Sequence, residues 1–316
     1  MVSYRRPSVR LLIALALPSA LALASCATRI SVAPSIDPAA GLPRESSVYF
    51  RLDRALLRET AEAVLSPESL KAARPFLLRT ERLTVSVLLP QEGTEQAGDG
   101  SGGELPRGAD FFGIAEGSYP AGAASFRLRL SRDWRKEGTT LVRRDGTLRI
   151  AFAGKNLLVA GTTDLGPLLE GLGSPGPNPL PEEIRRDWEA PGALWVPRPG
   201  DVWERARGEG PLSVPARGLL LTLIPNETGG GYSGSWIFVF DSEREARVYS
   251  PICRLFHLAF IRAALGSGTE AASALDRTVW SAEGSRLRAS GFPVSVPMVL
   301  KAASAFVPQA AQSSYH

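Results

Sequence analysis

The chain has 316 residues, 44% of them hydrophobic, which is enough for the core of one large domain or of two smaller ones. Its 36 Lys and Arg residues against 32 Asp and Glu give a net charge of +4. Arg5, Arg6 and Arg10 lie in a segment that we expect to be removed, so the remainder has 36 − 3 = 33 basic residues and a charge of 33 − 32 = +1. A nearly neutral domain lacks the basic surface that nucleic-acid binding requires, which excludes this class of partner.

The N-terminal segment has the three-part layout of a secretory signal. Three arginines precede an apolar run from Leu11 to Leu23, and the small residues Ala24 and Ser25 follow it. The run is 13 residues long and is interrupted by Pro18, whereas a helix that crosses the hydrocarbon core needs roughly 20 residues. We therefore predict a signal peptide over residues 1–25 and not a permanent membrane span.

The sequence Leu23-Ala24-Ser25-Cys26 resembles a lipobox, at which bacterial envelope proteins are lipidated on cysteine and cleaved on its N-terminal side. The resemblance implies that Cys26 becomes the first mature residue and carries acyl chains. Because each buried CH₂ contributes about 0.8 kcal/mol, two or more chains anchor a protein stably. Ala27, in place of aspartate at the second mature position, implies the outer membrane if the cell is Gram-negative. The alternative is an ordinary secretory signal in which Cys26 is incidental.

A first α+β unit is predicted over residues 46–172, after a lipidated N-terminus and tether over residues 26–45. The expected strands are 47–52, 82–89, 111–117, 140–144, 147–152 and 157–160, and the expected helices are 54–64, 67–78, 121–135 and 163–172, the last capped by Thr163. Residues 91–108 are rich in glycine and predict a loop. This loop lacks the Lys-Ser/Thr ending of a phosphate-binding loop.

A second α+β unit is predicted over residues 191–308, between a Pro-rich linker at 173–190 and a disordered tail at 309–316. Its expected strands are 193–196, 219–225, 236–240, 278–282 and 286–290, and its expected helices are 243–265 and 296–306. The order and spacing repeat those of the first unit. We therefore predict two related units, each a largely antiparallel sheet with helices on one face. Chance similarity of a generic strand order is the alternative.

No group of residues matches an enzyme motif. The histidines are His257 and His316, and no serine lies in a Gly-x-Ser-x-Gly sequence. Once Cys26 is acylated, Cys253 is the remaining cysteine and no intramolecular disulfide is expected. Cys253 is one helical turn from His257, but no second pair of ligands completes a zinc site. We expect no enzymatic activity, no metal and no cofactor. A hydrolase with dispersed carboxylates is the alternative, since the spatial separation of acids is invisible in a sequence.

The predicted helix 243–265 is the most informative internal feature, although Pro251 would also suit a later start near Ser250. From residue 252 onward its apolar side chains surround most of the circumference. A helix of this kind is buried, lines an apolar cavity or meets a membrane. The candidates for ligand- or membrane-facing side chains are Ile252, Leu255, Phe256 and Phe260.

The leading hypothesis is a non-enzymatic envelope lipoprotein that binds a lipid or other apolar ligand, or engages the membrane through amphipathic helices. In its anchor, its size and such helices the chain resembles spirochaetal outer-membrane-associated lipoproteins, which bind lipid and engage the bilayer. The expected partners are the membrane, through the acyl chains on Cys26, and a lipid or an envelope protein. The alternative is a structural or assembly lipoprotein that presents a protein-binding surface.

Overall fold

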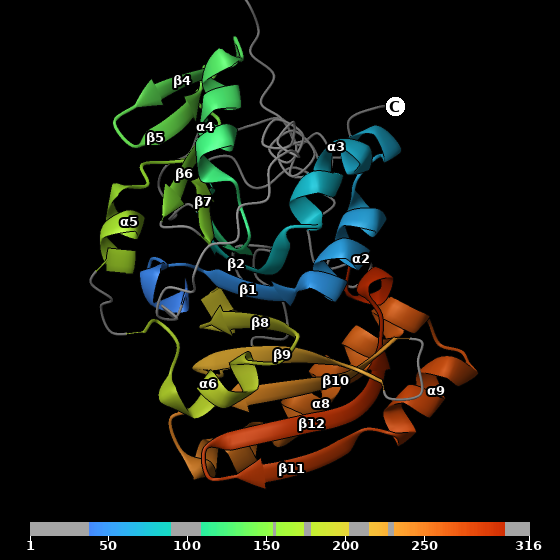
Figure 1. Cartoon of the computed structure of the whole chain (residues 1–316). Coiled ribbons are helices and arrows are strands. Elements are labelled where there is room, and N and C mark those ends of the chain that lie inside the picture. Colours follow the sequence, from blue (N-terminus) through green and yellow to red (C-terminus); the bar gives the residue numbers. More distant parts are fainter. Residues whose placement is uncertain are drawn as a thin grey trace, which may run out of the picture. The chain divides into compact units, whose positions relative to one another are not determined.

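The computed structural model describes residues 38–89, 109–153, 156–173, 178–201, 215–226 and 231–300. They form antiparallel strands and helices, which confirms the α+β class (Figure 1). They divide into two compact units. Unit 1 holds the described residues up to Ser46 and from Leu52 to Pro181, and unit 2 holds Ser47–Arg51 and the described residues from Glu182 onward. Cys26 and the segments predicted to be a signal peptide (1–25), a loop (91–108) and a tail (309–316) lie outside the described residues.

Unit 1 contains a sheet of strand order β2-β3-β7-β6-β5-β4. Its strands are β2 (Thr80–Leu88), β3 (Asp110–Gly117), β4 (Trp134–Glu137), β5 (Thr140–Arg143), β6 (Arg149–Ala153) and β7 (Leu157–Gly161). Its helices are η1 (Pro38–Gly41), α2 (Arg54–Val64), α3 (Pro67–Leu77), α4 (Ala121–Leu130) and α5 (Gly166–Gly173). The boundaries of α2 agree with the prediction. The side chain of Asp53 caps this helix by accepting a hydrogen bond from the backbone N–H of Leu56.

Helices cover both faces of the unit 1 sheet. On one face, Leu57 of α2, Leu77 of α3 and Leu128 of α4 share a core cluster with Ala115 of β3. Ile114, the residue before Ala115 in β3, points to the opposite face because side chains alternate along a strand. There its Cδ1 atom approaches Gly41 of η1. The expectation of helices on one face was therefore wrong for this unit.

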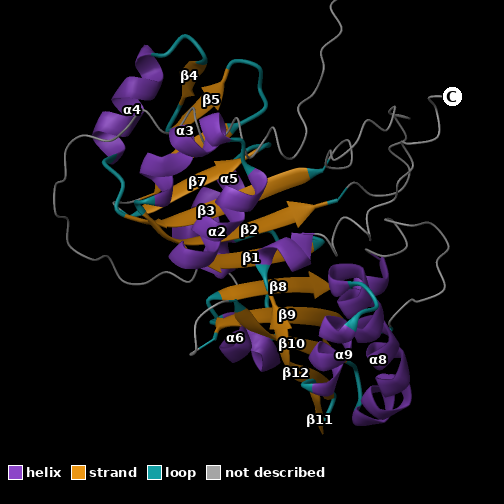
Figure 2. Ribbon diagram, turned by 90° about the vertical axis from the view of Figure 1, so that its right-hand side faces the viewer, coloured by secondary structure: helices purple, strands orange, loops and turns teal. Residues whose placement is uncertain are grey.

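Unit 2 contains a sheet of strand order β11-β12-β10-β9-β8-β1. Its strands are β1 (Val48–Asp53), whose residues up to Arg51 belong to this unit, β8 (Gly192–Pro197), β9 (Gly218–Pro225), β10 (Tyr232–Val239), β11 (Val279–Glu283) and β12 (Arg286–Val294). Its helices are α6 (Glu182–Trp188), α8 (Glu243–Leu265) and α9 (Thr269–Asp276). Helix α6 lies on one face of the sheet and α8 on the other (Figure 2), so the expectation of helices on one face was wrong for this unit too. Residues 296–300 are also helical, as expected for the start of the last helix.

The two units share a pattern of connections. In each, a pair of antiparallel strands (β2 and β3; β9 and β10) leads into a helix (α4; α8), and the last strand after that helix pairs back onto the second strand of the pair. This pattern is consistent with two related units. Descent from a duplication stays a prediction.

Three predicted elements differ in the structure. The helix expected over 121–135 ends at Leu130, because buried Trp134 begins strand β4. The second half of the expected linker is helix α6. The end of the expected tether packs into unit 1, where Ala39 and Leu42 are buried and Gly41 lies against Leu172 of α5.

Smaller differences concern short elements. A cap for α5 was expected from Thr163, but it is the Asp164 side chain that accepts a hydrogen bond from the N–H of Gly166, at 3.2 Å. Helix α9 was not predicted, since its buried residues are the small Ala271 and Ala274 and its apolar periodicity is weak.

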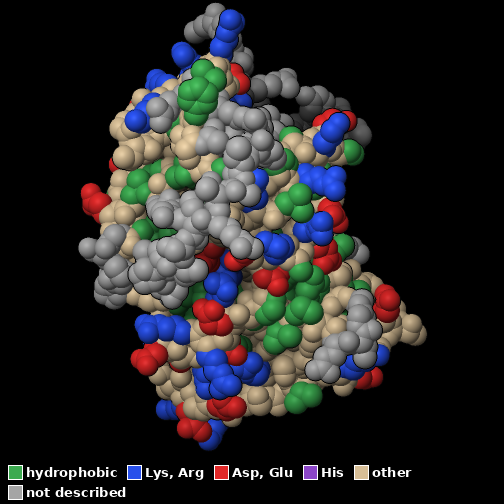
Figure 3. Space-filling view, in the orientation of Figure 1, with side chains coloured by type: hydrophobic (Ala, Val, Ile, Leu, Met, Phe, Trp, Pro, Cys, Tyr) green, Lys and Arg blue, Asp and Glu red, His purple; other side chains and the backbone are tan. Residues whose placement is uncertain are grey.

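Helix α6 is held on the unit 2 sheet by arginines that are distant from it in the sequence. Arg51 of β1 donates to the carbonyl oxygen of Trp188 at 3.1 Å and to the carboxylate of Glu189 at 2.6 Å. Arg288 of β12 pairs with Asp187 at 2.8 Å, and Arg217 pairs with Glu183. Figure 3 shows basic and acidic side chains interspersed in this region. Buried Ile184 and Trp188 supply the apolar part of the contact.

Arg51→Met tests this attachment. The Arg51 side chain is 6% exposed, and its loss removes the charged donor to the Trp188 carbonyl oxygen and the ion pair with Glu189. We expect unit 2 to lose about 1–3 kcal/mol of stability, measured by urea unfolding. Arg247→Met is the matched control, because this arginine pairs with Glu243 while 72% exposed, and it should change stability by less than about 0.5 kcal/mol. Equal effects of the two substitutions would contradict the assignment.

Candidate functional site on helix α8

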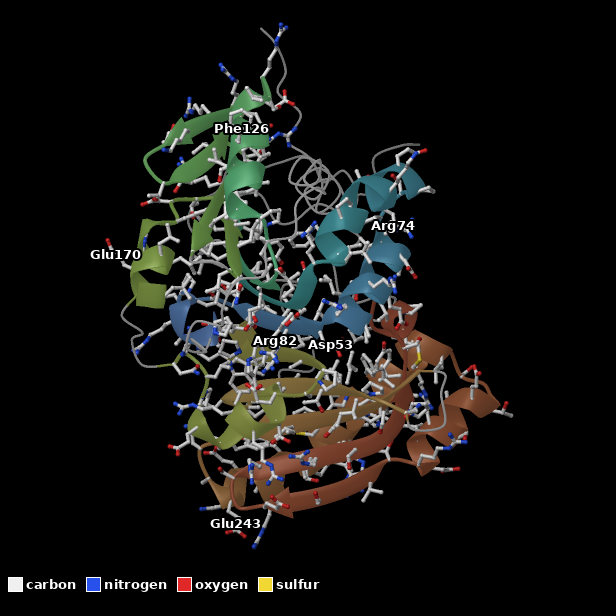
Figure 4. The ribbon with its side chains drawn as sticks, viewed as in Figure 1. Asp53, Arg74, Arg82, Phe126, Glu170 and Glu243 are labelled. Atoms are coloured by element: carbon white, nitrogen blue, oxygen red, sulfur yellow. The ribbon has the colours of Figure 1, made fainter. Side chains whose placement is uncertain are left out.

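Helix α8 begins at Glu243, labelled in Figure 4, and runs unbroken to Leu265. The Ser242 hydroxyl accepts a hydrogen bond from the Glu245 N–H at 3.2 Å, and the Glu245 carboxylate accepts one from the Asp241 N–H at 3.2 Å. This reciprocal capping fixes the N-terminus. The helix continues through Pro251, so the alternative start near Ser250 is wrong.

One face of α8 packs directly on the unit 2 sheet. The rings of Phe256 and Phe260 meet the Trp236 ring edge-on, with centroids 5.4 and 5.1 Å apart. Phe292 of β12 stacks on the same tryptophan at 6.4 Å. Phe256 and Phe260, predicted to face a ligand or membrane, are thus core residues that fill the space between helix and sheet.

His257 lies in the same interface, between the rings of Trp280 and Phe292. The Thr278 hydroxyl donates to the Ala274 carbonyl oxygen at 2.9 Å, so His257 Nε2 donates to Thr278 Oγ1 at 3.0 Å. Nδ1 is then an acceptor, and it is buried without a partner in the described part of the chain. Burial lowers the pKa of this imidazole from 6.5 to about 4. The residue is a neutral packing element at neutral pH.

Cys253 lies one turn before His257 and is fully buried. Burial raises the pKa of its thiol to about 12. A thiol that stays protonated is neither a nucleophile nor a metal ligand at neutral pH. Among the described residues, no three or more His, Cys, Asp or Glu side chains are grouped so that they could hold a metal ion.

The opposite face of α8 is apolar and exposed. Val248 is 60% and Leu255 is 52% exposed, and Pro251 lies between them on the same side. Their seven-residue spacing is two helical turns, so they form one stripe. We call Val248, Pro251 and Leu255 the α8 stripe. Of the four predicted residues, Leu255 belongs to the stripe, and Ile252 is half-buried at its margin.

Arginines frame this stripe. The helix carries four of them, at 244, 247, 254 and 262, against two glutamates, at 243 and 245, for a charge of 4 − 2 = +2. Arg244 and Arg262 are both exposed and lie beyond the two ends of the stripe. Arg254 lies over the Trp280 ring, 5.2 Å from its centroid. Among the described helices, α8 is also the one whose length and composition would suffice to cross a membrane. Its buried face, however, packs as the core helix of unit 2.

A second exposed apolar stripe lies on α4 in unit 1. Phe126, labelled in Figure 4, is 62% exposed, and Leu130, one turn later, is 69% exposed. This pair was not predicted from the sequence, because the hydrophobic residues of this segment show no clear helical periodicity. The helix was also expected to run to residue 135, whereas it ends at Leu130.

Solved structures share this fold, although no family model and no curated protein matches the chain. Crystal forms III, I and IV of TP0453, a protein of the spirochaete Treponema, superimpose with TM-scores of 0.58, 0.57 and 0.56. Each is 15% identical, and the match covers 86–87% of this chain and 97–100% of that one. At this identity the likeness shows a shared fold. It agrees with the spirochaetal resemblance at that level.

The His257 geometry predicts a stability that falls on acidification. The unfolded histidine, with a pKa of 6.5, binds a proton more readily than the folded one, with a pKa of about 4. The contribution is therefore complete above pH 6.5 and is lost progressively down to pH 4. Between pH 7 and pH 5 we expect a loss of about 2 kcal/mol, measured by urea unfolding.

His257→Gln is the matched variant, since its side-chain amide can still donate to Thr278 but does not titrate. Its stability should vary between pH 7 and pH 5 by about 2 kcal/mol less than that of the wild type. Identical pH profiles for the two proteins would show that His257 is not the titrating group.

Proposed function

We propose that the chain is a non-enzymatic lipoprotein of the bacterial cell envelope, anchored through Cys26, whose α+β body engages the membrane surface through the α8 stripe. The observation that carries the proposal is an exposed apolar stripe framed by arginines on a helix that is otherwise packed on a sheet. Helices of this composition lie in the plane of the interface with their apolar face in the acyl boundary.

The spacing of charge along α8 suits this placement. Arg244 and Arg262 are 18 residues apart, or about 27 Å along a helix, and the stripe lies between them. Long arginine side chains can extend to phosphate groups while apolar neighbours enter the boundary. Juxtamembrane basic residues contribute about 1 kcal/mol each at an anionic surface. The helix would therefore lie flat against the membrane and keep its core face on the sheet.

A ligand held between α8 and the sheet is the less favoured form of the hypothesis. Phe256 and Phe260 already contact Trp236 there, so a lipid would have to displace core aromatic rings. Displacing such rings costs several kcal/mol each. The outer face requires no such rearrangement.

An assembly role is the second candidate, and the observation that favours it is the stripe of Phe126 and Leu130 on α4. Aromatic and aliphatic side chains of this exposure act as anchors in protein interfaces. Affinity purification from crosslinked cells separates the candidates, since an assembly role requires a stoichiometric partner that depends on Phe126.

Leu255→Glu tests membrane engagement in the mature chain carrying Cys26→Ser, which lacks the acyl anchor. We expect its binding to vesicles of mixed zwitterionic and anionic phospholipid, measured by flotation, to fall about tenfold, because burying the exposed half of a leucine contributes about 1.4 kcal/mol. Ile224→Glu is the matched control: Ile224 of β9 is also 52% exposed and should bind as the Cys26→Ser chain does. Unchanged binding of Leu255→Glu would remove the α8 stripe from the proposal.

Cys26→Ser in the otherwise unchanged precursor tests the anchor. We expect it to abolish metabolic labelling with a radioactive fatty acid, since the thioether requires the cysteine sulfur. Cys253→Ser, which alters the buried thiol, should leave the labelling intact. Labelling that survives Cys26→Ser would show that the anchor lies elsewhere or is absent.

A further inference from the structure

Strand β11 forms the outer edge of the unit 2 sheet. Its inner side pairs with β12, from Val279 opposite Ser290 to Glu283 opposite Arg286. Four of its five residues are exposed, including Val279 at 64%. An edge strand presents a row of backbone donors and acceptors on its outer side, which can template the pairing of another strand.

The backbone groups on that outer side belong to Trp280 and Ala282. The Phe240 N–H donates to the Ser285 carbonyl oxygen, so Ser285 and Leu287 of the hairpin direct their backbone groups to β10. The backbone groups of Arg286 and Arg288 therefore point to β11, where they form hydrogen bonds with the backbone groups of Glu283 and Ser281. Trp280 and Ala282 alternate with these residues and face outward. Within the described residues, no backbone group pairs with them.

The opposite kind of edge occurs in unit 1, where β4 ends the strand order. Arg135, Lys136 and Glu137 follow one another there and are all exposed. Consecutive charges on an edge strand discourage pairing with a further strand. Strand β11 carries one charged residue, Glu283 at its end, and that carboxylate is paired with Arg286 at 3.0 Å. Its edge is therefore not protected by charge.

We propose that β11 pairs antiparallel with β11 of a second copy of this chain, about a two-fold axis through Ser281. A second copy is indicated as the partner because the side chains of β11 are complementary to those of another β11 in this register. In this register each Trp280 lies opposite a partner Ala282, which places a large side chain beside a small one on the face of α8. Each Val279 lies opposite the aliphatic stem of Glu283, and Ser281 lies opposite itself. Trp280 and Ala282 exchange the hydrogen bonds, and no like charges face each other.

The register gives a test by disulfide formation. Ser281 forms a non-hydrogen-bonded pair with its own copy, with Cα atoms about 4.5 Å apart, which a disulfide can bridge. Val279, exposed on the same face of β11, would lie about 14 Å from its copy and could not. We therefore compare Ser281→Cys with Val279→Cys in the purified mature chain carrying Cys26→Ser, where Cys253 is buried and unreactive. The readout is covalent dimer in an oxidised glutathione buffer.

We expect Ser281→Cys to form covalent dimer at least tenfold faster than Val279→Cys. Adding Ala282→Pro should slow Ser281→Cys dimerisation at least tenfold, because proline removes an outward N–H that an edge strand can spare in the monomer. Equal rates for the two cysteine variants, or no dimer from either, would overturn the proposal, and the latter would indicate that an extended segment of another protein is the occupant. Dimerisation that survives Ala282→Pro would overturn the backbone pairing. Neither result bears on the α8 stripe, which lies on a different element.

Discussion

The alternation of side chains along β10 and β12 governs the organisation of unit 2. Trp236 and Phe238 point to the face on which α8 packs, while Ile237, the residue between them, pairs with Arg288 and points to the face of α6. The face that contacts α8 is therefore aromatic, and the face that contacts α6 carries arginines. Figure 2 shows α6 on one side of these strands and α8 and α9 on the other. A shift of one residue in the register would place arginines under α8 and aromatic rings under α6.

This division explains how far the sequence could predict the structure. Local signals were sufficient for elements such as α2 and α8, whose caps and apolar spacing lie within a few residues, and for the hairpin turns. They failed at α6, which appears in the sequence as part of a proline-rich linker. Its partners lie up to about a hundred residues away: Arg217 pairs with Glu183, Arg286 donates to the Glu183 carbonyl oxygen, and Arg288 pairs with Asp187. Likewise, the sequence around Trp134 suggested that the helix of α4 continued to residue 135. In the structure Trp134 is buried in the core of unit 1 and belongs to strand β4. Partners that are distant in the sequence decided each of these cases.

The candidate site shows the same limit. Apolar residues almost surround α8, so the sequence could name Ile252, Leu255, Phe256 and Phe260 but could not say which of them the sheet would cover. Contact with Trp236 determines which face of α8 is covered. Phe256 and Phe260 are buried against this tryptophan, whereas Leu255 and Val248 lie on the exposed face. The arginines near the stripe are visible in the sequence, but their relation to an exposed face follows from the fold. The resemblance to a lipobox, by contrast, depends on a local sequence of four residues and on no fold, and it stays a prediction because Cys26 lies outside the described residues.

The contrast between the charged β4 edge and the uncharged β11 edge limits how far strand pairing could extend. A pair of chains joined through β11 uses both unprotected edges at once, since each copy contributes the same strand to a two-fold contact. The β4 edge of unit 1 carries Arg135, Lys136 and Glu137, which repel a further strand. A two-fold contact through β11 is closed at two copies, whereas an unprotected β4 edge would offer a second place for a strand to pair. If the protein is held on a membrane surface, as proposed, that asymmetry would separate a defined dimer from aggregation.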